Sequence, residues 1–363
     1  MKIIPGSRRR HYVARISVFL ITVALIAGMA GCGPVSQNLE IRTWYDLDAV
    51  RDNLSGNYTL MNDLNSTTSG YEELASPTAN KGKGWDPIGR TADNAFNGTF
   101  AGQGYEIRDL FINRPGDCPT GLFGWVIGGV IKNIGVVNVN VTGGCNVGAL
   151  VGDAHGTVSD SYSSGNVIGA AHAVGGLVGY NGDVCTLSNC YSTASVTSDN
   201  NVGGLVGENA GTVSKSYSTG SVTGDNIVGG LVGQSWGTVS NSYSTASVTG
   251  DLSVGGLVGV NSAGAGTVSN SYSAGSVTGN SYVGGLVGYN HGYTVSNSFW
   301  DTKTSGQATS DGGTGKNTTE MQYIATFSVA GWDISAVALN ETNPTYIWNI
   351  VNNVTYPFLG WQS

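Results

Sequence analysis

Three aspartates in the middle of the chain come nearest, by type and spacing, to catalytic chemistry: Asp153, Asp160 and Asp183. Glycoside hydrolysis uses two carboxyl groups about 5 to 9.5 Å apart, and these aspartates could form such a pair if neighbouring segments of the chain stack. A polysaccharide lyase needs a base and cations that stabilise an enolate, but Lys215 is the only Lys or Arg between residues 141 and 300. The aspartates therefore keep a hydrolase open as an alternative, whereas a lyase is disfavoured.

Other site chemistries have less support. Ser-His-Asp catalysis would need His155 or His172, and both histidines are expected at corners of the chain path. Asp199, Asp225 and Asp251 recur at equal spacing along the chain. Such a carboxylate column could hold Ca²⁺, although Asp is also an ordinary corner residue. We predict no catalytic residue, no metal site and no cofactor.

Four cysteines follow Cys32, and their positions group them in two pairs. Cys118 and Cys145 are separated by one period of the repeat described next, so stacking would bring them to a separation that a disulfide tolerates. Cys185 and Cys190 are close in sequence and could form a disulfide within one repeat. Both pairs are candidate disulfides, because export permits them. No two cysteines stand at the C-x-x-C spacing of zinc sites.

These residues lie in a repeated segment with a Gly-Gly-Leu-Val-Gly core, which recurs about once every 26 to 29 positions, a period typical of repeat architectures. Its central leucines, including those of two divergent copies, are Leu122, Leu150, Leu177, Leu205, Leu231, Leu257 and Leu286. This period suits one turn of a three-sided β-coil and is short for two helices with their loops. We predict an all-β fold, a single-stranded parallel β-helix (β-solenoid), with three short strands per rung. The general preference of crossovers favours a right-handed coil.

In the repeat at 202–227, strands are predicted at Val202–Val206, Thr212–Tyr217 and Ser221–Thr223. Stacking places equivalent residues in columns about 4.8 Å apart. The leucines form an interior ladder, and a polar column on the second strand is expected to hydrogen-bond along the stack. The polar column consists of Asp160, Asn189, Lys215, Asn241, Asn270 and Asn297.

One column is aromatic and consists of Tyr162, Tyr191, Tyr217, Tyr243, Tyr272 and Phe299. We expect a stacked ladder that stabilises the coil. The alternative is a platform on which sugars stack. The second interpretation requires that the column point outward.

The N-terminal residues resemble an export signal, with basic residues before an apolar run at 16–27. This run is shorter than the roughly 20 residues that span a bilayer. Met29-Ala30-Gly31-Cys32 resembles a bacterial lipobox, which predicts a diacylglycerol on the Cys32 thiol; ordinary signal cleavage nearby is the alternative. The remaining chain has 11 Lys plus Arg and 24 Asp plus Glu, a formal charge of −13. Nucleic acid is therefore not an expected partner.

The predicted organisation has five parts: a lipoprotein signal peptide (1–31), a tether (32–39), an N-terminal cap with irregular opening rungs (40–120), the repeat solenoid (121–300) and a C-terminal aromatic-rich cap (301–363). Caps are expected because an exposed last rung would invite edge pairing. The aromatic residues of the last part suggest a lid over the final rung, and a glycan-binding module is the alternative.

The repeats resemble the GLUG motif of bacterial exported proteins, carried here by Gly176-Leu177-Val178-Gly179 and its copies. Segments such as Pro87-Ile88-Gly89 and Gly331-Trp332-Asp333 also look like those that accompany GLUG repeats. The resemblance implies a β-solenoid at the cell surface, similar to regions of filamentous-haemagglutinin-like adhesins and of immunoglobulin A-cleaving metallopeptidases.

The peptidase activity does not carry over to this chain. Zinc peptidases of that kind need His-Glu-x-x-His, so that two imidazoles bind the metal and Glu activates water. None of the histidines is followed by glutamate; they are His11, His155, His172 and His291. The resemblance is therefore to the noncatalytic repeat region alone.

The leading functional prediction is an exported, lipid-anchored scaffold or adhesin at the cell surface or envelope, without catalysis. Its expected partners are the membrane, through the lipid, and a surface glycan or extracellular protein. The alternatives are a polysaccharide-degrading β-helix hydrolase and a purely structural envelope spacer.

Overall fold

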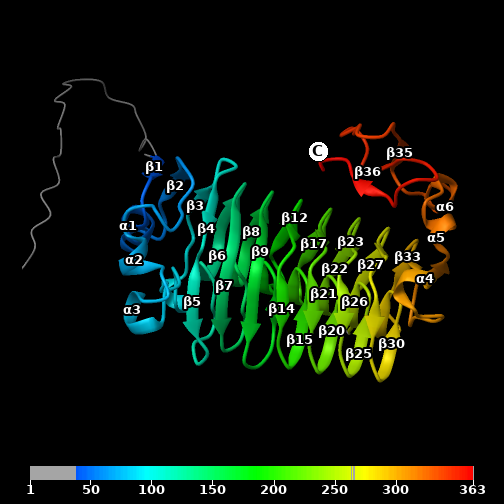
Figure 1. Cartoon of the computed structure of the whole chain (residues 1–363), viewed down its shortest axis with the longest axis horizontal. Coiled ribbons are helices and arrows are strands. Elements are labelled where there is room, and N and C mark those ends of the chain that lie inside the picture. Colours follow the sequence, from blue (N-terminus) through cyan, green and yellow to red (C-terminus); the bar gives the residue numbers. More distant parts are fainter. Residues whose placement is uncertain (1–37, 263, 265, 363) are drawn as a thin grey trace, which may run out of the picture. The chain divides into compact units, whose positions relative to one another are not determined.

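The computed structural model describes residues 38–262, 264 and 266–362, in which the repeats stack as rungs of a parallel β-solenoid (Figure 1). Equivalent strands pair in parallel and in register. Val206, for example, pairs with Val178 of one neighbouring rung and Val232 of the other. The predicted all-β, parallel β-helix is confirmed. The signal peptide and Cys32 lie outside the described residues.

The rungs contribute strands to three sheets. The first contains β1 (Asn38–Ile41), β2 (Asn57–Leu60), β3 (Thr99–Ala101), β6 (Phe123–Lys132), β8 (Val151–Ser159), β11 (Val178–Asn181), β16 (Val206–Asn209), β21 (Val232–Ser235), β26 (Val258–Asn261) and β31 (Val287–Asn290), with β12 (Thr186–Ser188), β17 (Thr212–Ser214), β22 (Thr238–Ser240), β27 (Thr267–Ser269) and β32 (Val295–Ser296). β8 pairs with both β11 and β12, so it joins these two rows of short strands.

The second sheet contains β4 (Glu106–Arg108), β5 (Phe111–Arg114), β7 (Gly135–Gly143) and β9 (Tyr162–Gly169), followed by two rows of short strands. One row is β13 (Tyr191–Ser192), β18 (Tyr217–Ser218), β23 (Tyr243–Ser244), β28 (Tyr272–Ser273), β33 (Phe299–Asp301) and β34 (Thr314–Lys316); the other is β14 (Ser195–Thr197), β19 (Ser221–Thr223), β24 (Ser247–Thr249) and β29 (Val277–Thr278). The third sheet is β10 (Val174–Gly175), β15 (Asn200–Gly203), β20 (Asn226–Gly229), β25 (Leu252–Gly255) and β30 (Ser281–Gly284).

The strands within a rung are shorter than predicted. The span Val202–Val206 is interrupted between β15 and β16, and the span Thr212–Tyr217 is interrupted between β17 and β18. The first interruption follows from the Gly-Gly corner and the second from a residue in the left-handed backbone conformation, Lys215 (φ 49°). The third predicted strand coincides with β19.

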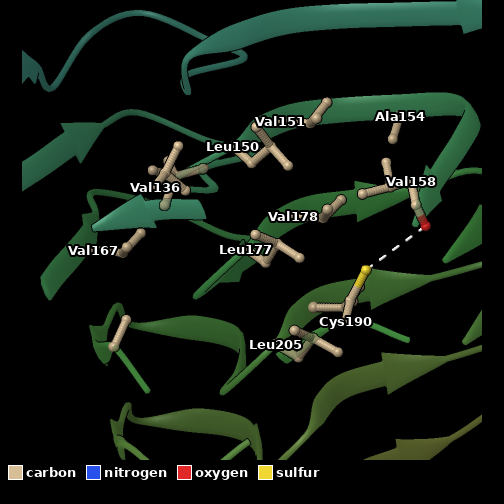
Figure 2. Close-up of a cluster of buried hydrophobic side chains, with 14 of the residues drawn as sticks. Val136, Leu150, Val151, Ala154, Val158, Val167, Leu177, Val178, Cys190 and Leu205 are labelled. Atoms are coloured by element: carbon tan, nitrogen blue, oxygen red, sulfur yellow. Dashed lines mark hydrogen bonds between the residues drawn. The ribbon is translucent and has the colours of Figure 1, made fainter. Parts of the chain in front are cut away.

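The interior is a continuous stack of aliphatic columns. Leu150, Leu177 and Leu205 lie one above another (Figure 2). All seven motif leucines have no exposed surface, from Leu122 to Leu286. Because each rung completes the burial of the next, no rung has a core of its own.

The repeated glycines are required by close backbone packing at the corner between β15 and β16. A Cβ added to Gly203 would lie 1.9 Å from the carbonyl oxygen of Val206, and one added to Gly204 would lie 2.2 Å from that of Gly230. No side chain fits at such distances. The motif is therefore accounted for by the fold and not by chemistry.

Short helices lie at both ends of the coil: α1 (Trp44–Asp48), α2 (Tyr71–Leu74) and α3 (Ala79–Gly82) with the 3-10 turns η1 (Ala49–Asp52) and η2 (Ala92–Asn94), and α4 (Thr302–Ser305), α5 (Thr318–Met321) and α6 (Ile324–Ser328). At the N-terminal end, the fully buried rings of Trp44 and Trp85 pack 5.7 Å apart. Along the described chain, no helix is long and apolar enough to cross a membrane.

The C-terminal part differs from the predicted lid, because the residues that cover the last rung are not the aromatic ones. Residues 302–316 cover the last rung: β34 pairs with β33, and Ser310 Oγ accepts hydrogen bonds from the N–H groups of Leu286 and Val287. The aromatic segment then turns back along the side of the solenoid (Figure 1). It contains a small sheet of β35 (Ile334–Ala336), β36 (Trp348–Ile350) and β37 (Phe358–Leu359).

Candidate functional site

The aromatic column points outward. In β13, β18, β23 and β28 each tyrosine is followed by a serine with no exposed surface, from Ser192 to Ser273. Because side chains alternate along a strand, the tyrosines lie on the outer face. Successive rings from Tyr162 to Tyr272 stack with centroids 4.8 to 5.0 Å apart and planes within 5° of parallel.

This stacking determines what the ladder can bind. A sugar stacks on the face of an aromatic ring, but each ring within the ladder has its faces against its neighbours. At the N-terminal end, a Cβ added to Gly135 would lie 2.5 Å from the Tyr162 ring, so backbone covers that face too. The ladder therefore presents ring edges and hydroxyl groups, and not a row of sugar-stacking faces.

The aromatic C-terminal segment occupies half of the ladder. Tyr272 is 1% exposed and Tyr243 is 7% exposed, and the Trp348 ring lies 5.9 and 6.1 Å from them. The hydroxyl of Tyr272 donates to the carbonyl oxygen of Pro357 (2.6 Å), and Gln362 Nε2 donates to the hydroxyl of Tyr243 (2.8 Å). The other half, from Tyr162 to Tyr217, remains partly exposed.

Phe299 ends the aromatic column but leaves the stack. It pairs in register with Tyr272, yet its ring contacts Phe327 edge-on at 5.5 Å and Trp332 at 6.0 Å. The last ring of the column thus belongs to the core of the C-terminal segment.

A groove of about 240 Å³ lies where this segment ends over the ladder. Trp361 Nε1 donates to the carbonyl oxygen of Lys215 (3.0 Å), and its ring lies 5.8 Å from Tyr217 and 6.3 Å from Tyr191. The groove is lined by Asn189, Lys215, Pro344, Thr345, Tyr346, Ile347, Gly360 and Trp361. It joins residues that are more than a hundred positions apart in the sequence.

The polar column lies at a corner, and not on a strand as predicted. All of its members have positive φ, between 47° and 53°, from Asp160 to Asn297. Asn and Asp tolerate this left-handed conformation better than other non-glycine residues. At the first step Asn189 Nδ2 donates to Asp160 Oδ1 (3.0 Å). The column therefore owes its composition mainly to backbone conformation.

Of the three aspartates considered for hydrolysis, Asp153 and Asp183 lie on either side of the His155 ring. Asp153 is buried, accepts a hydrogen bond from Asn146 Nδ2 (2.7 Å) and lies 3.0 Å from His155 Nε2. Asp183 lies 3.8 Å from the other ring nitrogen, so the imidazole stands between the two carboxylates. Burial raises the pKa of Asp153, against the opposing effects of His155 and Asn146. Asp160 lies at the separate corner described above.

The chain also contains a Gly-x-Ser-x-Gly sequence, Gly233-Gln234-Ser235-Trp236-Gly237. In α/β-hydrolases this spacing marks an exposed nucleophile between a strand and a helix. Here Ser235 ends β21 with no exposed surface, and its hydroxyl accepts a hydrogen bond from Asn209 Nδ2 (3.1 Å). This serine is therefore part of a buried polar ladder.

Among the residues that the structure describes, no group of three or more His, Cys, Asp or Glu could hold a metal ion. In the aspartate column, the N–H of Asp225 donates to the carbonyl oxygen of Asp199 (3.1 Å), and Asn280 Nδ2 donates to Asp251 Oδ1 (2.8 Å). These are the contacts of corner residues.

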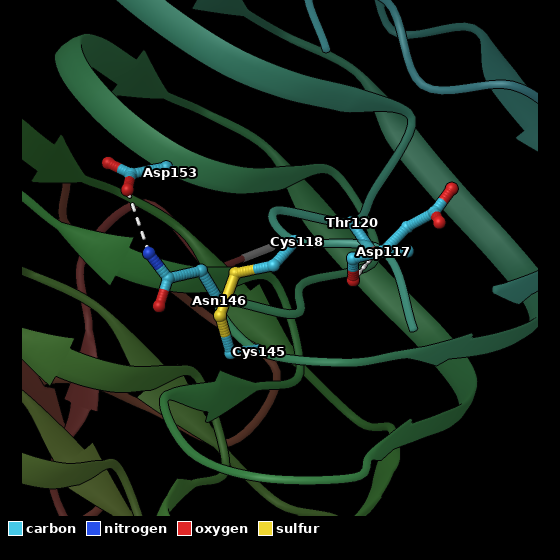
Figure 3. Close-up of a disulfide and its surroundings, with 6 residues drawn as sticks. All are labelled: Asp117, Cys118, Thr120, Cys145, Asn146 and Asp153. Atoms are coloured by element: carbon cyan, nitrogen blue, oxygen red, sulfur yellow. Dashed lines mark hydrogen bonds between the residues drawn. A yellow bond between two sulfur atoms is a disulfide. The ribbon is translucent and has the colours of Figure 1, made fainter. Parts of the chain in front are cut away.

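Cys118 and Cys145 form a disulfide between neighbouring rungs, with Cα atoms 5.0 Å apart (Figure 3). The second predicted pair is wrong, because Cys185 and Cys190 are free and buried. β12 lies between them, and a strand advances about 3.3 Å per residue, which holds their Cα atoms beyond the roughly 7 Å that a disulfide allows. Burial raises the pKa of both thiols to about 12.

The ladder predicts a loss of stability at alkaline pH. Burial raises the pKa of Tyr217 and Tyr356 to about 12, and that of Tyr272 well above its usual value. Unfolded tyrosines ionise near about pH 10, so between pH 10 and 12 the unfolded state releases protons that the native state retains. The free energy of unfolding should be constant with respect to these groups below about pH 10 and should fall as the pH rises above it.

Denaturant unfolding followed by circular dichroism at pH 8, 10 and 11.5 measures this effect. Tyr272→Phe removes one of the ionising groups. The free energy of unfolding should therefore fall less steeply with pH, by a slope that corresponds to at most one proton. A free energy of unfolding that is the same at pH 8, 10 and 11.5 would contradict the prediction.

Comparison with known proteins adds the following. The GLUG motif matches residues 170–197, 198–223, 224–249 and 279–299. Over 163 residues the chain is 35% identical to Halomucin of Haloquadratum walsbyi, a match that covers 43% of this chain and 2% of that protein. Over 127 residues it is 37% identical to a protein of Evansella cellulosilytica named as a Gly-rich membrane protein, covering 33% of this chain and 14% of that one. The chain thus matches only a small part of each relative.

A solved structure from Bacteroides ovatus, described as a candidate immunoglobulin A1 protease, superposes with a TM-score of 0.61 at 22% identity. The match covers 91% of this chain and 94% of that one. At this identity the likeness concerns the fold. Together with the stacked rungs, it shows that the GLUG motifs of this chain belong to a parallel β-solenoid fold.

Proposed function

We propose that this chain is a lipid-anchored scaffold or adhesin at the cell surface, which binds an extracellular glycan or protein along its solenoid and has no catalytic role. The observation that carries the proposal is the outer face of the second sheet. Exposed threonines repeat there at four successive rungs and pair in register: Thr197, Thr223, Thr249 and Thr278.

Such a row suits a polymer better than a small molecule. Rungs repeat about every 4.8 Å, so one hydroxyl follows another at a regular spacing along the coil. Each hydrogen bond to an exposed hydroxyl contributes little by itself, but many weak contacts on one polymer act together. Apart from Lys215, there is no Lys or Arg between residues 141 and 300, and the threonine row itself is uncharged and offers neutral hydrogen bonding.

Three further observations support the proposal. The glycines and leucines of the repeat are accounted for by packing, the His155 imidazole lies between Asp153 and Asp183, and the relatives include a protein named as a membrane protein. The lipid anchor rests on the Met29-Ala30-Gly31-Cys32 sequence.

The binding test incubates purified residues 33–363 with immobilised glycans and matrix proteins and scores both retention and the appearance of shorter products. We expect retention without cleavage. New products that disappear with Asp153→Asn or Asp183→Asn would contradict the proposal in favour of a hydrolase, and a lack of retention on every surface would favour a structural spacer.

The anchor is tested separately by labelling cells that express the full chain with palmitate. The label should be present on the wild-type chain and on the Ser36→Ala control, and it should be lost from Cys32→Ala. Equal labelling of the three chains would rule out the anchor.

A further inference from the structure

Lys215 is the exception in its column. The other five residues at this corner are Asn or Asp, which suit the left-handed conformation, whereas Lys215 adopts φ 49° without that advantage. Residues held in such conformations against local preference concentrate at functional positions. The substitution of Lys for Asn at one rung therefore calls for a reason outside the column.

The charge of Lys215 has no partner in the fold. No ion pair involves its ammonium group within residues 38–262, 264 and 266–362. The residue is exposed, and it is the only Lys or Arg between residues 141 and 300 of an acidic chain. The one Lys or Arg between residues 141 and 300 is thus free to pair with an external anion.

The groove brings two aromatic side chains, Trp361 and Tyr346, together with Lys215. Trp361 is held on Lys215 by the hydrogen bond from its indole N–H to the Lys215 carbonyl oxygen, and Tyr346, which also lines the groove, is 39% exposed. Drug-sized ligands fill pockets of about 300 to 1,000 Å³, so a groove of about 240 Å³ suits a unit of one sugar ring. Unlike the stacked tyrosines, Trp361 and Tyr346 are not enclosed between rungs.

We propose that this groove binds a negatively charged sugar residue of a polysaccharide, with Lys215 pairing with its carboxylate or sulfate and Trp361 and Tyr346 packing against its ring. The inference rests on the proposed binding function and specifies its ligand. Lys215 would set the preference for an anionic sugar unit.

The test measures binding to the full chain, purified in detergent, by isothermal titration with two ligands of equal length, hexagalacturonate and maltohexaose. We expect tighter binding of hexagalacturonate that weakens as salt is added. Lys215→Asn should weaken it about tenfold, the loss of one charge-assisted contact, while Lys215→Arg should stay within about threefold of the wild type. Sulfated maltohexaose separates sulfate from carboxylate recognition.

Controls separate this inference from folding and from the general proposal. Lys215→Asn installs the residue used by other rungs, so its melting temperature should not fall. Lys303→Asn removes an exposed lysine outside the groove and should leave binding unchanged. Unchanged hexagalacturonate binding by Lys215→Asn, equal binding of maltohexaose, or no binding of either hexagalacturonate or sulfated maltohexaose would each overturn the inference. Retention of other glycans or proteins in the panel would still support the proposed function.

Discussion

Replacing Gly229 with alanine should destabilise the solenoid by more than about 3 kcal/mol, the range of the most damaging single substitutions. Gly229 is the equivalent of Gly203 one rung later. A Cβ at this position would lie 1.8 Å from the carbonyl oxygen of Val232 and 2.6 Å from the backbone nitrogen of Gly259. Both are main-chain atoms, so no side-chain rotation can relieve the clash.

The effect should extend beyond one rung. The shift needed to accommodate the methyl group would disturb the pairing of β20 with β15 and β25, and in a solenoid each interface supports its neighbours. Chemical denaturation followed by circular dichroism measures the change. Gly116→Ala is the matched control, because a Cβ there meets nothing within 4 Å. Equal stability of the two variants would contradict the packing argument.

Replacing Trp348 with alanine should release the aromatic C-terminal segment from the ladder. The Trp348 side chain is fully buried, and its ring lies 4.7 Å from Trp332 and 5.9 Å from Tyr272. Replacing a buried Trp with Ala costs about 3 to 5 kcal/mol. Because the rungs are held by their own columns, this loss should fall on the docking of the segment and leave the solenoid folded.

Tyrosine ionisation reports this release directly. Burial beneath the segment holds the pKa of Tyr272 and Tyr243 above the usual value. In Trp348→Ala both groups should titrate closer to pH 10, as followed by ultraviolet absorbance. Trp236→Ala makes the same chemical change outside the C-terminal segment and should leave the titration as in the wild type. An unchanged titration in Trp348→Ala would mean that the segment stays docked.

Much of the solenoid could be predicted from spacing alone. The motif leucines recur at nearly constant steps, and because a rung can satisfy its backbone only by pairing with the next, equal spacing implies equal position in the stack. This reasoning located the interior column of Leu205 and Leu231 and the stacked tyrosines. It also predicted that Cys118 lies beside Cys145, which is one period away in the sequence.

The same reasoning failed where the backbone departs from the repeat. The corner at Lys215 requires a left-handed residue, which the pattern alone did not separate from a strand position. Cys185 and Cys190 looked close in sequence, but an extended strand between them keeps their sulfur atoms apart. A Gly-x-Ser-x-Gly spacing occurred in β21 and its turn without the exposed serine that catalysis needs.

By itself, then, the sequence determined the coil, its period and its columns, because those depend on contacts between residues one repeat apart. Only the tertiary structure decided which way the tyrosines face and that the aromatic segment returns to cover Tyr243 and Tyr272. It alone placed Trp361 on Lys215, 146 residues earlier in the chain. Contacts at that separation follow no period, since they arise from the free energy of burying the segment against whichever face accommodates it.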